Sequence, residues 1–153
     1  MSDYRLTVKR KLTLEENRAL YERHWPVLLR LTARYLPMLD ISQGMPCRVE
    51  LLDALRGSWL LDQRADRPSH EDVVSGVGLA FGVLLAERLA MEWCLIEDSF
   101  GEDISMVKFN SRPDQPWVKL SVPPFNYVAK REHTQNVDVF ADGVREIERM
   151  IKD

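Results

Sequence analysis

The chain has 153 residues, of which 45% are hydrophobic and 29% charged, with a formal net charge of −3. These values are typical of one globular domain that buries its own core without disulfide or metal cross-links. The weak acidity argues against nucleic acid as a partner, and no apolar run approaches the ~20 residues of a membrane span.

The first part of the chain, about residues 1–66, is predicted to be helical. Thr13 followed by Glu16 forms a capping box, so a helix is predicted to begin at about Leu14. Apolar residues then recur on one face of this helix. Pro26 cannot donate a backbone hydrogen bond, so the helix is expected to kink or restart there, and Pro37 ends it.

Two further helices are predicted before the pattern changes. Pro46 suits the first turn of a helix that reaches to about Asp62. Ser69, with Asp72 three residues later, indicates the N-cap of a third helix, which runs from residue 70 to about residue 90.

Three glycines in VVSGVGLAFG, residues 73–82, raise the question of a phosphate-binding loop. Their spacing, Gly76, Gly78 and Gly82, departs from G-x-G-x-x-G, and a helix cap rather than a strand precedes them. Gly78, Gly82 and Ala86 instead share one face of a helix. The pattern therefore predicts a central, buried helix against which a neighbouring element packs closely.

After this helix the periodicity becomes that of strands. Three strands are predicted over residues 91–98, 104–110 and 116–122, with SRPDQ at 111–115 as a hairpin loop. FNYVAKRE, residues 125–132, is predicted to be a fourth strand, separated from the third by two prolines that mark a bend or an edge.

A last helix is predicted from near Asn136, where an apolar stripe resumes. The order of elements favours the α+β class: N-terminal helices, then an antiparallel three- or four-stranded meander, then a C-terminal helix packed on the sheet. We expect a single domain over residues 1–153, whose α+β part covers about residues 67–153.

Charge is unevenly distributed along the chain. Residues 1–36 hold eight Lys or Arg and four Asp or Glu, whereas residues 92–103 hold five acids and no base. Two solvated faces explain this pattern simply. The alternative is an acidic corner that binds a cationic protein surface.

Motifs for catalysis, metals and cofactors are absent from the sequence. There is no G-x-S-x-G, H-E-x-x-H or C-x-x-C, and the three histidines are scattered, so no cofactor or metal is predicted. Cys47 and Cys94 are expected to be free, buried thiols. No apolar core follows the positively charged N-terminus, so we expect no signal peptide and a cytoplasmic location.

A paired-carboxylate mechanism has one candidate, Glu97. If residues 92–97 form a strand, Glu97 shares a face with Trp93 and could act as an acid or base with a raised pKa. The simpler interpretation is that Glu97 is solvated at the strand end, or pairs with Lys130 or Arg131.

The segment SGVGLAFGVLLAERLAMEWCLIEDSFGEDISM, followed by VPPFNYVAKREHTQNVDV, resembles a small family of bacterial domains of unknown function. The resemblance covers about residues 70–140. It rests on a G-x-x-x-G helix, a W-x-x-x-x-D strand with an aromatic-glycine turn, and a later Lys-Arg pair: Gly78, Gly82, Trp93, Asp98, Phe100, Gly101, Lys130 and Arg131. The family brings no established activity, substrate or cofactor.

Two functions from different classes are candidates. The first is a non-catalytic, protein-binding domain, adaptor-like or immunity-like in character, whose acidic corner meets a cationic protein surface with an aromatic anchor. The second is a small enzyme with a site on the sheet face around Trp93, Glu97 and Lys130. The candidate binding residues are Trp93, Glu97, Asp98, Phe100, Glu102, Asp103, Lys130 and Arg131.

Overall fold

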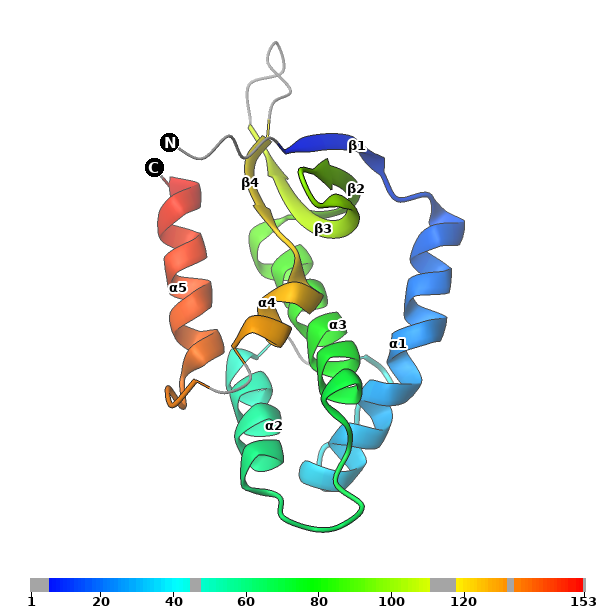
Figure 1. Cartoon of the computed structure of the whole chain (residues 1–153), viewed down its shortest axis with the longest axis vertical. Coiled ribbons are helices and arrows are strands. Elements are labelled where there is room, and N and C mark those ends of the chain that lie inside the picture. Colours follow the sequence, from blue (N-terminus) through cyan, green and yellow to red (C-terminus); the bar gives the residue numbers. More distant parts are fainter. Residues whose placement is uncertain (1–5, 45–47, 111–117, 132–133, 153) are drawn as a thin grey trace.

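The computed structural model describes residues 6–44, 48–110, 118–131 and 134–152. These residues form an α+β fold of helices and one antiparallel sheet, in which the strand order is β1-β2-β3-β4 (Figure 1). In chain order the elements are β1 (Thr7–Lys11), α1 (Leu14–Tyr35), α2 (Val49–Leu61), α3 (His70–Leu89), β2 (Glu92–Asp98), β3 (Gly101–Phe109), β4 (Val118–Val122), α4 (Pro124–Lys130) and α5 (Val139–Lys152).

Helix α3 lies at the centre of the molecule, with the sheet at one end and the other helices around it (Figure 1). Buried side chains from these elements join one continuous core. A smaller cluster, formed by Cys94, Ile96 and Val107, lies on the opposite face of the sheet. Within the described residues no helix combines the length and the apolar character needed to cross a membrane.

Both predicted helix caps are present. The Thr13 hydroxyl accepts a hydrogen bond from the Glu16 N–H at 3.1 Å, and the Glu16 carboxylate accepts one from the Thr13 N–H at 3.0 Å. Helix α1 does not restart at Pro26, because buried leucines on both sides hold it against the core while only one helical hydrogen bond is lost. The Ser69 hydroxyl caps α3 by accepting from the Asp72 N–H at 3.1 Å.

The glycines of α3 contact three different elements. A Cβ built on Gly76 would lie 2.6 Å from Cδ1 of Leu31 in α1. On Gly78 it would lie 2.4 Å from the ring of Phe125 in α4, and on Gly82 it would lie 2.2 Å from the ring of Trp93 in β2. The predicted close packing against the small-residue face is therefore confirmed.

Gly82→Ala is expected to destabilise the fold by on the order of 1–3 kcal/mol, because the new methyl group overlaps the packed Trp93 ring. Denaturant unfolding measures the change. Gly57→Ala in the interior of α2 is the matched control, because its built Cβ has no atom within 4 Å apart from its chain neighbours and the backbone of its own helix. That variant should gain about 0.5–1 kcal/mol from helix propensity. Equal stabilities for the two variants would contradict the close packing.

The prediction of a strand over residues 125–132 is wrong, because residues 125–130 lie in helix α4. Pro124 occupies the first turn of α4, where a missing N–H has no cost. Phe125 and Val128 are three residues apart, so they lie on one helical face and pack inward against α3 and the core. Burial of these two side chains therefore stabilises a helix here, despite their β propensity.

The strand that completes the sheet is β1, near the N-terminus. It pairs antiparallel with β2, from Thr7 opposite Glu97 to Lys11 opposite Cys94, with a register shift between Val8 and Arg10. The other strands match their predicted positions, although β3 begins earlier, at residue 101. The predicted hairpin loop at 111–115 lies outside the described residues.

Helix α2 holds the connection into α5 through two polar side chains. The Asp53 carboxylate accepts hydrogen bonds from the N–H groups of Phe140 and Ala141 at 2.8 and 3.1 Å, so it caps α5 from another helix. Arg56, whose exposed fraction is 3%, donates to backbone carbonyls in the segment before α5. These acceptors are the carbonyl oxygens of Arg131, Thr134 and Asn136.

Asp62, which follows α2, joins α1 to the next loop. Its carboxylate accepts from Arg64 Nε at 3.0 Å, from Arg34 Nε at 2.9 Å and from the Tyr35 hydroxyl at 2.7 Å. Its side chain is only 2% exposed. The two guanidinium groups, Arg64 first, hold the pKa of this carboxyl well below its ordinary value.

Because the folded-state pKa of Asp62 is depressed, its contribution to stability is present above the ordinary Asp pKa and is lost as the pH falls below about 4. Asp62→Asn should lower Tm at pH 7, and the gap to wild type should narrow in acid. Asp66→Asn is the control: Asp66 also pairs with Arg34, but its side chain is 77% exposed. A similar loss in both variants at pH 7 would contradict this role.

Candidate functional site

The expected acidic corner is neutralised largely by the chain itself. Lys9 Nζ lies 3.1 Å from Glu97 Oε2 and 2.6 Å from Glu102 Oε1. Lys11 Nζ lies 3.1 Å from Glu92 Oε2. The basic strand β1 thus lies beside the acidic segment at 92–103, and three of the five acids of that segment bind bases of β1.

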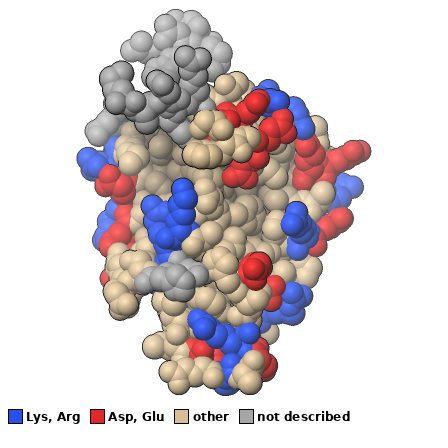
Figure 2. Space-filling view, viewed as in Figure 1, with Lys and Arg blue, Asp and Glu red and all other residues tan. Residues whose placement is uncertain are grey.

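Electrostatics reinforce this attachment of β1. The ammonium of Lys9, which donates a hydrogen bond to Glu102, holds the pKa of that carboxyl below its ordinary value. Arg10 forms an ion pair with Glu16 at the start of α1 and, together with the Thr13 N–H, lowers the pKa of Glu16 to about 2. On the side of the molecule seen in Figure 2, acidic and basic side chains lie next to one another at the upper right.

The remaining acids shape the β2–β3 turn. Asp98 Oδ1 accepts a hydrogen bond from the Phe100 N–H at 2.8 Å, and Gly101 has a φ of +118°, which favours glycine. Asp103 Oδ1 accepts from the Ile104 N–H at 2.8 Å. Phe100 at the tip is 91% exposed. The turn therefore presents an aromatic ring to solvent on a backbone held by hydrogen bonds.

Four of the predicted site residues line one hollow. It has a volume of about 630 Å³ and lies between the β2–β3 turn, β4 and α4. The β2–β3 hairpin contributes Asp98 at the end of β2, Phe100 in the turn and Asp103 in β3. Lys130 comes from α4 and Lys119 from β4. We call Asp98, Phe100, Asp103 and Lys130 the turn surface.

The other predicted residues lie elsewhere. Trp93 is half-buried against Gly82, with its ring 6.2 Å from that of Phe125. Glu97 binds Lys9 rather than Lys130 or Arg131, and Glu102 binds Lys9 as well. Lys130 lines two hollows, one at the turn and one between β4 and α5, and Trp93 and Glu97 line neither of them. The residues of the enzyme candidate are therefore not gathered around one of these cavities.

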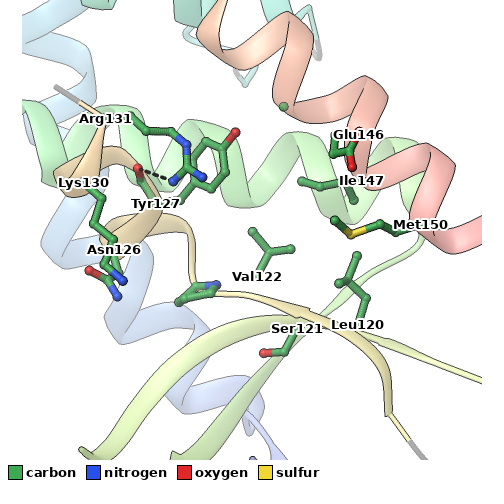
Figure 3. Close-up of a pocket in the computed structure, with 12 residues that line it drawn as sticks. Leu120, Ser121, Val122, Asn126, Tyr127, Lys130, Arg131, Glu146, Ile147 and Met150 are labelled. Atoms are coloured by element: carbon green, nitrogen blue, oxygen red, sulfur yellow. Dashed lines mark hydrogen bonds between the residues drawn. The ribbon is translucent and has the colours of Figure 1, made fainter. Parts of the chain in front are cut away.

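A second cavity involves α4 and was not predicted from the sequence. It lies between β4, α4 and α5 and has a volume of about 340 Å³ (Figure 3). Its apolar wall consists of Leu120, Val122, Tyr127, Ile147 and Met150. We call this cavity the β4–α5 cleft. Its polar lining includes Asn126, Lys130, Arg131 and Glu146.

Arg131 occupies a fixed place in the β4–α5 cleft. Its guanidinium carbon lies 3.6 Å from the centroid of the Tyr127 ring, and its NH1 donates to the Tyr127 carbonyl oxygen at 3.4 Å. Figure 3 shows the guanidinium beside that ring, with Lys130, the last residue of α4, just before Arg131 in the chain. Among the described residues, neither Lys130 nor Arg131 forms an ion pair with a carboxylate.

The structure also brings together a histidine and a serine that the sequence left apart. His24 Nδ1 in α1 lies 2.6 Å from Ser75 Oγ in α3, beside a groove of about 820 Å³. Burial lowers the pKa of His24. Ser75 lies inside a helix, where backbone N–H groups are already bonded and cannot stabilise an oxyanion. We interpret the pair as a contact that holds α1 to α3.

Cys94 is buried and free, as predicted, and burial raises the pKa of its thiol. Cys47 lies outside the described residues. A search of the described part of the chain for clusters of His, Cys, Asp and Glu that could hold a metal ion found none.

Comparisons with protein-family models, curated proteins and solved structures found no match to this chain. The resemblance to bacterial domains of unknown function therefore stays a prediction from the sequence.

Lys9→Ala is expected to loosen β1, because it removes the cation that Glu97 and Glu102 share. Hydrogen exchange at the β1 amides should become faster than in wild type at low ionic strength. In concentrated salt, which screens exposed ion pairs, the difference should shrink. The matched control is Arg30→Ala, an exposed cation without an ion pair among the described residues. Unchanged exchange at β1 in Lys9→Ala would contradict the role of these pairs.

Proposed function

We propose that this chain is a non-catalytic domain that binds another protein through the turn surface. One observation carries the proposal: the Phe100 side chain is 91% exposed at the tip of a turn held by hydrogen bonds. An exposed aromatic ring on a pre-organised backbone loses little conformational freedom when a partner buries it. Aromatic residues of this kind often carry much of the affinity of a protein interface.

Charge gives the partner a second requirement. Asp98 and Asp103 lie beside Phe100, and both line the hollow next to it. A partner with a recess for the ring and a cation opposite Asp103 would complement the turn. Because Lys9 already binds Glu97 and Glu102, the attraction is weaker than the sequence suggested. The charge is therefore proposed to affect the rate of association more than the affinity.

An adaptor-like or immunity-like role is the form of protein binding that we favour. The small enzyme around Trp93, Glu97 and Lys130 receives less support, because the Trp93 ring packs in the core and Glu97 is bound to Lys9. A cytoplasmic location belongs to the same proposal.

The test is affinity capture from cells that produce the protein naturally, with bound proteins quantified by mass spectrometry. Phe100→Ala should lose a protein that wild type retains. The control is Met38→Ala, which truncates another apolar side chain that is 97% exposed and lies after α1. Identical bound proteins for wild type and both variants would refute the proposal.

A second measurement uses any protein that this comparison identifies. Reversing Asp103 to Lys should slow its association at low salt and have little effect at high salt. We choose Asp103 alone because Glu102 anchors β1 and Asp98 holds the turn, so their reversal would disturb the fold. A rate that does not change at low salt would mean that the charge of the turn has no role in binding.

A further inference from the structure

The β4–α5 cleft combines an apolar wall with two cations at the end of α4. Lys130 and Arg131 are adjacent, and no carboxylate binds either of them within the described residues. The acid in the lining, Glu146, forms an ion pair with Arg149 one helical turn further along α5. The local charge therefore favours an anion.

The size of the cleft limits what can enter. Its volume of about 340 Å³ is near the lower end of the range of roughly 300–1,000 Å³ that small-molecule sites occupy. The apolar wall, from Leu120 and Val122 in β4 to Ile147 and Met150 in α5, suits one apolar side chain (Figure 3). A ligand that fits both features has an apolar group and a carboxylate a few ångströms apart.

The strand beside the cleft has an available edge. β4 is the last strand of the sheet and pairs only with β3 in the described part of the chain. No other backbone hydrogen bond to residues 118–122 exists there. An extended peptide can add to such an edge, because its own N–H and C=O groups satisfy those of the strand.

We propose that the β4–α5 cleft binds the C-terminal end of an extended peptide whose last residue is apolar. The peptide adds as a strand to the outer edge of β4, and its last side chain enters the cleft. Its terminal carboxylate binds Lys130 and Arg131. This site shares Lys130 with the turn surface but does not involve Phe100, so it can be correct whether or not a partner buries that ring.

The walls of the cleft are held in place without a ligand. Arg56 binds the carbonyl groups of the segment that links α4 to α5, and Asp53 caps the start of α5. The guanidinium of Arg131 already stacks on Tyr127. A peptide therefore meets a pre-formed site and need not order these elements when it binds.

The test uses hexapeptides with alternating Thr and Val and a last residue of Leu, Ile, Val, Phe or Met, each as a free acid and as a C-terminal amide. Titration into ¹⁵N-labelled protein should shift the amide signals of β4, α4 and the second half of α5. At least one free acid should bind about 10-fold more tightly than its amide, because the amide removes the charge that Lys130 and Arg131 bind. No shift with any free acid, or equal affinity for acid and amide, would overturn the proposal.

Variants separate the cations of the cleft from general charge. Lys130→Ala should weaken binding of the free acid several-fold and leave the amide unaffected. The matched control, Lys119→Ala, removes a lysine that lines the turn hollow but not the cleft, and should bind like wild type. Arg131→Lys keeps the charge while losing the planar stack on Tyr127, and should also bind more weakly. Equal effects of Lys130→Ala and Lys119→Ala would refute the assigned role of Lys130.

Octanoate distinguishes a peptide from a small carboxylate, since it carries the same charge and an apolar chain but no backbone groups. The proposal expects octanoate to bind more weakly than the peptides, because it has no N–H and C=O groups to pair with the edge of β4. Octanoate binding as tight as that of the best peptide, without a contribution from the β4 edge, would overturn the peptide assignment.

Discussion

Close approach of three elements to α3 is the constraint on which the rest of the structure depends. Gly76 admits α1, Gly78 admits α4, and Gly82 admits the ring of Trp93 from the sheet. Each glycine inside a helix costs about 0.5–1 kcal/mol relative to alanine, so the helix alone would not favour them. Burial of Phe125, Trp93 and the leucines of α1 offsets this cost. Since Phe125 fixes α4 against α3, it also fixes Lys130, which lines both hollows beside β4, and Arg131, which lines the β4–α5 cleft.

Much of this fold could be predicted from local signals. The capping residues Thr13 and Ser69 gave the starts of α1 and α3, because a cap depends on residues only three positions apart. The segment at 125–132 was mistaken for a strand because its aromatic and β-branched residues have β propensity. Its helical conformation depends on a contact between Phe125 and Gly78, which lie far apart in the sequence. Propensity cannot report such a contact.

In the candidate sites, too, features set by neighbouring residues were predicted, whereas features set by contacts distant in the sequence were missed. The turn with Phe100 was identified correctly, because Asp98 and Gly101 determine it locally. The partner of Glu97 and Glu102 was missed, because β1 carries three consecutive bases and only Thr7 and Val8 favour a strand. The β4–α5 cleft was missed entirely, since its walls come from three elements and one of them had been predicted as a strand. Similarly, nothing in the sequence places His24 beside Ser75.

The two edges of the sheet are protected in different ways, and this difference bears on where a partner can bind. β1 carries Lys9, Arg10 and Lys11 and a register shift, both of which discourage pairing with a second strand. β4 carries one lysine, Lys119, and relies instead on α5, which packs beside it (Figure 1). That cover is incomplete where the cleft lies. A row of lysine and arginine side chains discourages strand addition in general. A partly covered edge instead accepts only a strand that also fits the helix beside it. Selective strand addition is therefore expected at β4 rather than at β1, because only β4 pairs an available edge with a shaped, cationic cavity.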